Sequence, residues 1–192
     1  MVNIRQAIFL DRDGTLIHEK NYTKDPADIE FVAGVFPLLR QARAQGWQLV
    51  VITNQAGVAQ GLMTEAEVRY FNAIMCVQLR AQDVILDGIY FCPHHPSKGF
   101  APYVTDCHCR KPKPGMLLQA ARELGIDLKK SWMIGDRRAD IEAGWNAGCR
   151  SILVKTGYGA ETAGNLSSWS RLPEQICVDL AEALDWVAAK DK

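Results

Sequence analysis

The chain has 192 residues, of which 48% are apolar and 23% are charged, and both its composition and its length fit one globular domain (residues 1–192). Its 22 basic and 22 acidic residues balance, which argues against a general nucleic-acid binder and against a protein that binds anionic membranes. No apolar run reaches the ~18 residues that span a bilayer, and the N-terminus lacks a signal-peptide core, so we expect a cytoplasmic protein.

The predicted elements alternate between strands and helices. In chain order they are a strand at Ala7–Leu10, a helix at Val35–Gln45, a strand at Leu49–Ile52, a helix from Thr64 to about Arg80, a strand at Gly88–Cys92, a helix at about Met116–Leu124, a strand at Ser131–Ile134, a helix at Arg138–Ala147, a strand at Ser151–Val154 and a helix at about Asp179–Ala189. Thr64 and Glu67 form a capping box at the start of the long second helix.

Strands that alternate with helices predict an α/β fold with a doubly wound, mostly parallel, Rossmann-like sheet. The strands are apolar throughout, as expected where helices cover both faces of the sheet. In such folds ligands bind outside the carboxyl ends of the strands. Residues 92–110 are the exception to this regularity, because they hold three prolines and no clear periodicity.

Polar residues follow the ends of three predicted strands and precede one helix. They are Asp11 and Asp13 after the first strand, Thr53 and Asn54 after the second, Asp136 and Asp140 after the fourth, and Lys111 before the third helix. Carboxylates that meet in one crevice repel one another, and a bound Mg²⁺ relieves that repulsion. A hydroxyl donor and a cation beside them suit a transferring phosphoryl group.

These residues carry a family resemblance. The segments Asp11-Arg12-Asp13-Gly14-Thr15, Thr53-Asn54, Lys111-Pro112 and Gly135-Asp136-x₃-Asp140 resemble the four ordered motifs of the haloacid dehalogenase superfamily. The resemblance implies that Asp11 is an aspartyl nucleophile and Asp13 its acid/base, and that Thr53 and Lys111 stabilise the phosphoryl group. It also implies that Asp11, Asp136 and the backbone carbonyl of Asp13 bind Mg²⁺. The role of Asp140 stays open, and Arg110 and Lys113 lie close to Lys111.

A cysteine- and histidine-rich stretch lies between the third strand and the third helix. Cys92, His94, Cys107 and Cys109 supply three thiolates and one imidazole, which suit tetrahedral Zn²⁺ in a closed structural site. His95 and His108 could each replace a ligand, and the alternative is a set of unconnected thiols in a polar loop. We expect the zinc loop, at about residues 92–109, to hold an irregular segment beside the crevice.

Within the superfamily, this zinc loop followed by RKPKPGM is similar to the D-glycero-D-manno-heptose 1,7-bisphosphate 7-phosphatases, with histidinol-phosphate phosphatase domains as close relatives. The similarity covers nearly the whole chain to about residue 160. It implies a fold without a large cap domain, since the gaps between motifs hold only short segments. The substrate-binding residues expected from it are Glu19, Lys20, Asn21, Tyr22, Asn54, Arg110 and Arg137.

The resemblance therefore predicts a Mg²⁺-dependent phosphatase that cleaves a small phosphorylated sugar at C7, in heptose-nucleotide precursor synthesis for lipopolysaccharide. We also expect a monomer. Arg110 and Arg137 could hold the phosphate that is not cleaved, which histidinol phosphate lacks. Histidinol-phosphate phosphatase is the enzyme alternative. A phospho-accepting receiver domain is the alternative from another class, although it explains neither Asp13 nor the zinc loop. A zinc-organised interaction module would leave the strand-end carboxylates unexplained.

Overall fold

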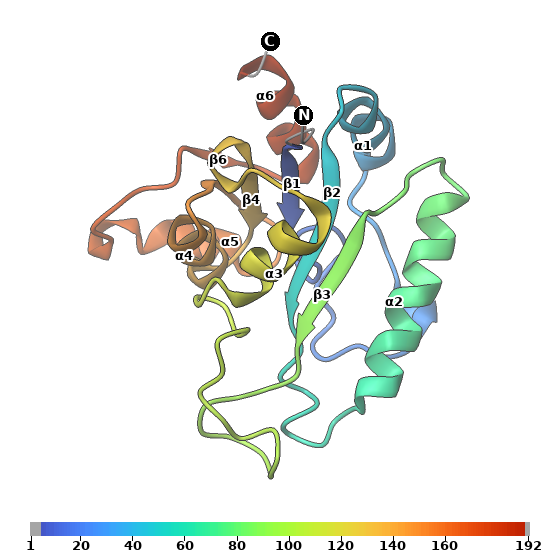
Figure 1. Cartoon of the computed structure of the whole chain (residues 1–192), viewed down its shortest axis with the longest axis vertical. Helices are drawn as coiled ribbons and strands as arrows, with labels where there is room; N and C mark the ends of the chain where they lie inside the picture. Colours follow the sequence, from blue (N-terminus) through green and yellow to red (C-terminus); the bar gives the residue numbers. More distant parts are fainter. Residues whose placement is uncertain (1–4, 191–192) are drawn as a thin grey trace.

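The computed structural model describes residues 5–190. Its centre is a six-stranded sheet with the strand order β3-β2-β1-β4-β5-β6, in which every neighbouring pair is parallel (Figure 1). The strands are β1 (Ala7–Leu10), β2 (Gln48–Asn54), β3 (Gly88–Cys92), β4 (Trp132–Gly135), β5 (Arg150–Val154) and β6 (Gln175–Cys177). The predicted fold class is confirmed.

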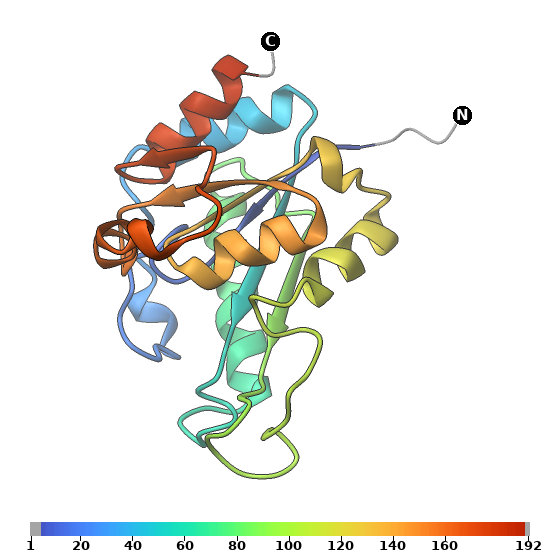
Figure 2. The same cartoon turned by 90° about the vertical axis from the view of Figure 1, so that its left-hand side faces the viewer.

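Helices cover both faces of this sheet (Figure 2). They are α1 (Val35–Ala44), α2 (Glu65–Arg80), α3 (Gly115–Leu124), α4 (Arg138–Ala147), α5 (Gly159–Gly164) and α6 (Leu180–Lys190), with short 3-10 turns at Pro26–Asp28, Leu128–Lys130 and Leu166–Ser168. The capping box predicted at the start of α2 is present, because Thr64 Oγ1 accepts from the backbone N–H of Glu67 and the Glu67 carboxylate accepts from that of Thr64.

The alternating side chains of the strands divide the core into two layers. In β1, Ile8 and Leu10 join the apolar cluster under α1, α2 and α6, while Ala7 and Phe9 join the cluster under α3 and α4. All four side chains are at most 1% exposed, as expected for a strand buried on both faces. The two layers hold β1 rigidly, and the residue that follows it, Asp11, therefore leaves the sheet at a well-defined place.

The C-terminal segment holds two elements that the sequence did not predict. The edge strand β6 has only three residues and α5 has six. Segments this short do not show the apolar periodicity that distinguishes a strand or a helix in a sequence. β6 forms through its pairing with β5, in which Leu153 faces Ile176. A tertiary contact therefore creates this strand.

The loops at the carboxyl ends of the strands gather at one end of the molecule (Figures 1 and 2). The longest of them joins β3 to α3 and hangs below the arrowhead of β3 in Figure 1. No large cap domain interrupts the chain in the part that the structure describes. None of the helices in residues 5–190 combines the length and the apolar character needed to cross a membrane.

Candidate active site

Lys111 lies at the centre of the site and joins two carboxylates. Its Nζ lies 2.6 Å from Oδ1 of Asp11 and 2.6 Å from Oδ1 of Asp140, and it also donates to the backbone carbonyl of Ile52 at 2.7 Å. Lys111 and Asp140 are at most 3% exposed. Burial disfavours the ammonium charge, but the carboxylates of Asp11 and Asp140 outweigh burial and raise the pKa of Lys111 above its usual value. Lys111 therefore keeps its positive charge.

The side-chain amide of Asn54 fixes the backbone of Lys111. Its Oδ1 accepts from the Lys111 N–H at 3.1 Å, and its Nδ2 donates to the Lys111 carbonyl at 3.1 Å. Asn54 comes from the end of β2, so this pair of bonds ties the loop before α3 to the sheet. The same side chain lines the cleft, where the sequence predicted a substrate contact.

Asp136 directly follows β4 and is fully buried, and only one of its two carboxylate oxygens has a hydrogen-bond partner among the described residues. Its Oδ2 accepts from the backbone N–H of Tyr158 at 2.7 Å, whereas its Oδ1 has no hydrogen-bond partner among the described residues. Gly14 and Gly157 both have positive φ angles and leave room for this carboxylate, because a Cβ at either position would overlap it. A buried oxygen without a partner costs free energy, and a bound cation would remove that cost.

One oxygen atom from each of Asp11, Asp136 and Asp140 lies within 4.8 Å of the others. Burial raises the pKa of Asp11 to about 7 and that of Asp136 to about 8, with the neighbouring carboxylates adding to the shift. Carboxylate oxygens are the ligands that Mg²⁺ prefers. Asp140 uses one oxygen for Lys111 and the other for the backbone N–H of Arg137, which leaves Asp11 and Asp136 as the better donors for an ion.

Asp13 lies at the cleft, and two side chains bind its carboxylate. The guanidinium of Arg12 contacts both oxygens at 3.0–3.1 Å, and Gln55 Nε2 donates to Oδ2 at 2.8 Å. The same Gln55 Nε2 lies 2.8 Å from the hydroxyl oxygen of Thr53. Gln55 thus links the segments that follow β1 and β2. It brings Asp13, which the sequence assigned as the acid/base, close to Thr53, which the sequence assigned to the phosphoryl group.

The cleft above these residues has a volume of about 310 Å³. Glu19, Asn21, Tyr22, Arg110 and Arg137 all line it, as the sequence predicted for substrate-binding residues. Lys20 does not line the cleft; its ammonium lies 3.2 Å from the Glu30 carboxylate. The substrate-binding role of these residues stays a prediction.

Arg110 and Arg137 both line the cleft, and each contacts neighbouring groups. Arg110 Nη1 donates to the backbone carbonyl of His94 at 3.0 Å. The Arg137 guanidinium lies 3.5 Å from the centre of the Tyr158 ring and 3.9 Å from the Glu19 carboxylate. A guanidinium has five N–H donors, so these contacts leave donors for a bidentate anion such as phosphate.

Sequence reasoning missed six residues of the cleft, of which three have large polar side chains. Arg12, Gln55 and Tyr158 line it together with the predicted residues. Arg12 and Gln55 lie next to motif residues, so adjacency could have suggested them, but their side-chain directions depend on the folded structure. Tyr158 follows β5 and reaches the site only because β5 lies beside β4 in the sheet.

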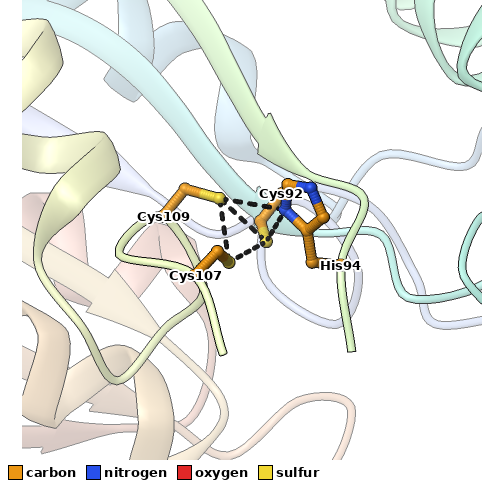
Figure 3. Close-up of side chains that lie close together, drawn as sticks. All are labelled: Cys92, His94, Cys107 and Cys109. Carbon is orange, nitrogen blue, oxygen red and sulfur yellow. Dashed lines mark hydrogen bonds between the residues drawn. The ribbon is translucent and has the colours of Figure 1, made fainter. Parts of the chain in front are cut away.

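The four predicted zinc ligands converge at one point (Figure 3). The sulfur atoms of Cys92, Cys107 and Cys109 lie 3.1–3.4 Å apart, and His94 Nδ1 is 3.4 Å from Cys109 Sγ and 3.7 Å from Cys92 Sγ. The hydrogen bond between Cys92 and Cys109 lowers the pKa of the Cys109 thiol to about 5 and raises the pKa of the Cys92 thiol. Cys109 is therefore the cysteine of this pair that more readily forms the thiolate that a metal needs. These four residues could hold a metal ion.

His95 and His108 do not belong to this cluster of four. The imidazole Nδ1 of His95 instead accepts from the backbone N–H groups of Ser97 and Lys98 at 3.2 and 2.9 Å. His95 therefore organises the turn that follows it, and the ligand set that the spacing first indicated is the one that the fold brings together.

Comparison with known proteins gives the same family. The model of the HAD-hydrolase-like family matches residues 108–183. The D-glycero-beta-D-manno-heptose-1,7-bisphosphate 7-phosphatase of Haemophilus influenzae is 46% identical over 155 residues, which are 80% of this chain and 84% of that one. The enzyme of the same name from Escherichia coli K12 is 43% identical over 178 residues, which are 88% and 93% of the two chains.

Solved structures agree with these relatives. A D,D-heptose 1,7-bisphosphate phosphatase from B. bronchiseptica, crystallised with magnesium and phosphate, superposes with a TM-score of 0.82 and 31% identity. The match covers 97% of this chain and 99% of that one. A similar TM-score, 0.81 with 32% identity, relates the chain to a HAD-like phosphatase from Mesorhizobium loti. The likeness therefore extends over the whole fold as well as over the motifs.

Proposed function

Because the chain belongs to the D-glycero-β-D-manno-heptose 1,7-bisphosphate 7-phosphatases, within the haloacid dehalogenase-like hydrolases, we propose that it hydrolyses the C7 phosphate of that sugar and releases heptose 1-phosphate. The observation that carries the proposal is the meeting of Asp11, Asp13 and Lys111 at one cleft with arginines at its mouth. The relatives' names support the β anomer as the substrate.

The first half of the reaction transfers the phosphoryl group to the protein. A carboxylate oxygen of Asp11 attacks phosphorus, and the bond from phosphorus to the C7 oxygen breaks. Asp13 gives its proton to that oxygen, so that the sugar leaves as an alcohol and not as an alkoxide. Lys111 and Thr53 stabilise the negative charge on the phosphoryl oxygens. An aspartyl phosphate on Asp11 and a deprotonated Asp13 result.

The second half returns the protein to its starting state. Asp13, now a base, takes a proton from water, and the water oxygen attacks phosphorus. The bond to the Asp11 oxygen breaks and inorganic phosphate leaves. Asp13 carries the proton again, and the balance is one ester and one water consumed for one alcohol and one phosphate formed.

Two metal ions fit the residues present. We propose that Asp11 and Asp136, with the backbone carbonyl of Asp13, hold Mg²⁺; the unpartnered Oδ1 of Asp136 and the magnesium-bound relative support this. Bound Mg²⁺ would neutralise charge between the carboxylates and the phosphoryl oxygens. We also propose that Cys92, His94, Cys107 and Cys109 hold structural Zn²⁺, since three thiols and an imidazole suit a closed tetrahedral site.

The arginines at the mouth favour a bisphosphate over histidinol phosphate. Arg110 and Arg137 line the same cleft as Lys111, and we propose that they hold the C1 phosphate while C7 reacts. Histidinol phosphate has no second phosphate for these two guanidinium groups to bind. A receiver domain would need no such contacts beyond the phosphorylated aspartate.

The proposal extends to the domain organisation, oligomeric state, location and partners of the enzyme. We propose a single-domain, monomeric, cytoplasmic protein with no nucleic-acid or membrane partner. Its product would enter heptose-nucleotide synthesis for lipopolysaccharide. The balanced charge of 22 basic and 22 acidic residues supports the absence of polyanionic partners.

Product analysis tests the proposed reaction. The purified protein is incubated with Mg²⁺ and the β-heptose 1,7-bisphosphate, and phosphorus NMR follows the two phosphates. We expect the C7 signal to disappear while the C1 signal persists. Histidinol phosphate and simple sugar monophosphates are assayed in parallel, and we expect kcat/KM to be lower for each of them. Loss of the C1 phosphate, or a higher kcat/KM for histidinol phosphate, would contradict the proposal.

A further inference from the structure

Arg12 is a buried cation that the proposed mechanism does not use. It lies between Asp11 and Asp13 in the chain, and its side chain is 2% exposed. Its guanidinium binds both oxygens of the Asp13 carboxylate, with Nε 3.1 Å from each and Nη2 3.0 Å from each. A two-pronged contact of this kind fixes the plane of a carboxylate as well as its position.

The other side of Arg12 is anchored to helix α2. Its Nη1 donates to Oδ1 of Asn72 at 2.8 Å, and its guanidinium carbon lies 4.5 Å from the centre of the Phe71 ring. Asn72 is 6% exposed although α2 packs this face against the apolar core. A polar residue at such a position requires a partner, and Arg12 is the partner that the structure gives to its carbonyl oxygen.

Asn72 does not line the cleft. It reaches the site only through Arg12, whose remaining donors hold Asp13. The chain of contacts therefore runs from α2 through Asn72 and Arg12 to the Asp13 carboxylate, while Gln55 binds that carboxylate from the side of β2. Helix α2, through Asn72 and Arg12, and the end of β2, through Gln55, thus determine where the carboxylate of Asp13 points.

We propose that Asn72 and Arg12 are positioning residues that orient Asp13 for proton transfer to the leaving group. This inference rests on the proposed function, in which Asp13 is the acid. A general acid must lie within hydrogen-bond reach of the atom that it protonates, and it contributes about 10²–10⁴-fold when it does. Without the Asn72 contact, Arg12 has a free donor and a wider choice of rotamers, and Asp13 loses its fixed direction.

The test compares esters with different leaving groups. An alkyl ester such as heptose 1,7-bisphosphate needs a proton on its leaving oxygen, whereas 4-nitrophenyl phosphate releases a stable anion that needs none. For Asn72→Ala we expect kcat/KM to fall about 10- to 100-fold on the alkyl ester, part of the usual contribution of a general acid. On 4-nitrophenyl phosphate we expect it to stay within about 3-fold of the wild type.

Met75→Ala is the matched control. Met75 lies one turn further along the same buried face of α2, is 0% exposed and belongs to the apolar core. Its truncation should lower the melting temperature but leave the ratio of the two kcat/KM values unchanged. If the ratio of the two kcat/KM values in Asn72→Ala equals that of the wild type, with or without an equal loss on both esters, the proposal is overturned and Asn72 is a purely structural residue.

Arg12→Lys serves as the second variant if Asn72→Ala does not fold. It keeps the positive charge but not the planar fork, and it should show the same selective loss on the alkyl ester. An unchanged ratio in folded Arg12→Lys would overturn the proposal. If the wild type does not hydrolyse the heptose bisphosphate, the proposed function fails; glucose 6-phosphate then replaces it as the alkyl ester, and the same ratio still tests the positioning role.

Discussion

Lys111 shows how much a single residue depends on its surroundings. Arg110, Lys111 and Lys113 are all cations within four positions, yet only Lys111 reaches Asp11. Lys113 lies 2.6 Å from the exposed Asp106 carboxylate, and Arg110 lines the cleft and donates to the backbone carbonyl of His94. The amide of Asn54 sets this division, because it holds the backbone of Lys111 against the end of β2. Asp140, whose role the sequence left open, is the second carboxylate that holds the Lys111 ammonium.

Arg110 and Arg137 line the cleft, and their proposed contact with the C1 phosphate can be tested by mutation. Arg110→Ala and Arg137→Ala should each lower kcat/KM for the bisphosphate about 10- to 150-fold, because a charged hydrogen bond is worth ~1.5–3 kcal/mol. Hydrolysis of a simple sugar monophosphate should change little, since it has no distal phosphate to lose. The ratio of the two kcat/KM values in each variant is the measurement. Equal losses on both substrates would assign the arginines to the core of the site.

At the scale of elements, the segment between β3 and α3 has little core of its own. Its apolar side chains include Phe100, which is 51% exposed, and Val104, which is 38% exposed. The Cys/His cluster instead ties the end of β3, through Cys92, to the residues that immediately precede Lys111. A metal at this cluster would stabilise the segment in place of an apolar core.

We therefore expect about one zinc per chain in protein purified without chelator, as a single four-ligand site requires. Cys107→Ser should abolish the zinc content, make the loop more sensitive to proteolysis and lower the melting temperature. Cys76→Ser is the matched control, because Cys76 lies in α2 outside the cluster, and its zinc content should equal that of the wild type. Elemental analysis gives the measurement, and wild-type protein without zinc would contradict the site.

Burying the charged forms of Asp11 and Asp136 costs free energy, and the packing of the whole fold must offset this cost. Burial raises the pKa of Asp11 to about 7 and that of Asp136 to about 8, from an ordinary value of 3.8. The folded protein thus holds these protons more tightly than the unfolded chain. By linkage, the stability contributed by the two groups is fully present below about pH 3.8 and is lost as the pH rises through about 7 to 8.

This predicts a pH dependence of the melting temperature in protein stripped of Mg²⁺. Between pH 5 and pH 8.5 the wild type should lose stability relative to Asp136→Asn, in which one of the two acids cannot titrate. Added Mg²⁺ should raise the melting temperature of the wild type more at pH 8 than at pH 6, because the ion competes with protons for the same carboxylates. A difference between the two proteins that is constant with pH would contradict the prediction.

Local patterns in the amino-acid sequence are enough to predict the alternation of elements, the parallel sheet and the family motifs. Apolar runs and caps act over a few residues, so β1, β3 and α4 lie where local patterns predicted them. The family motifs likewise singled out Asp11 and Lys111, and the fold brings these two side chains into contact; their catalytic roles stay predictions. The cluster of Cys92, His94, Cys107 and Cys109 followed in the same way from local spacing.

Features that depend on residues far apart in the chain emerge only when the chain folds. The edge strand β6 exists through its partner β5, and Tyr158 reaches Asp136 because of the order of the strands. Arg12 contacts Asn72, which lies 60 positions away in the sequence. The residues around Arg12 and those around Asn72 show no pattern that predicts this contact. Side-chain direction and long-range pairing arise when the elements pack together, because packing selects one rotamer among several that the local sequence allows.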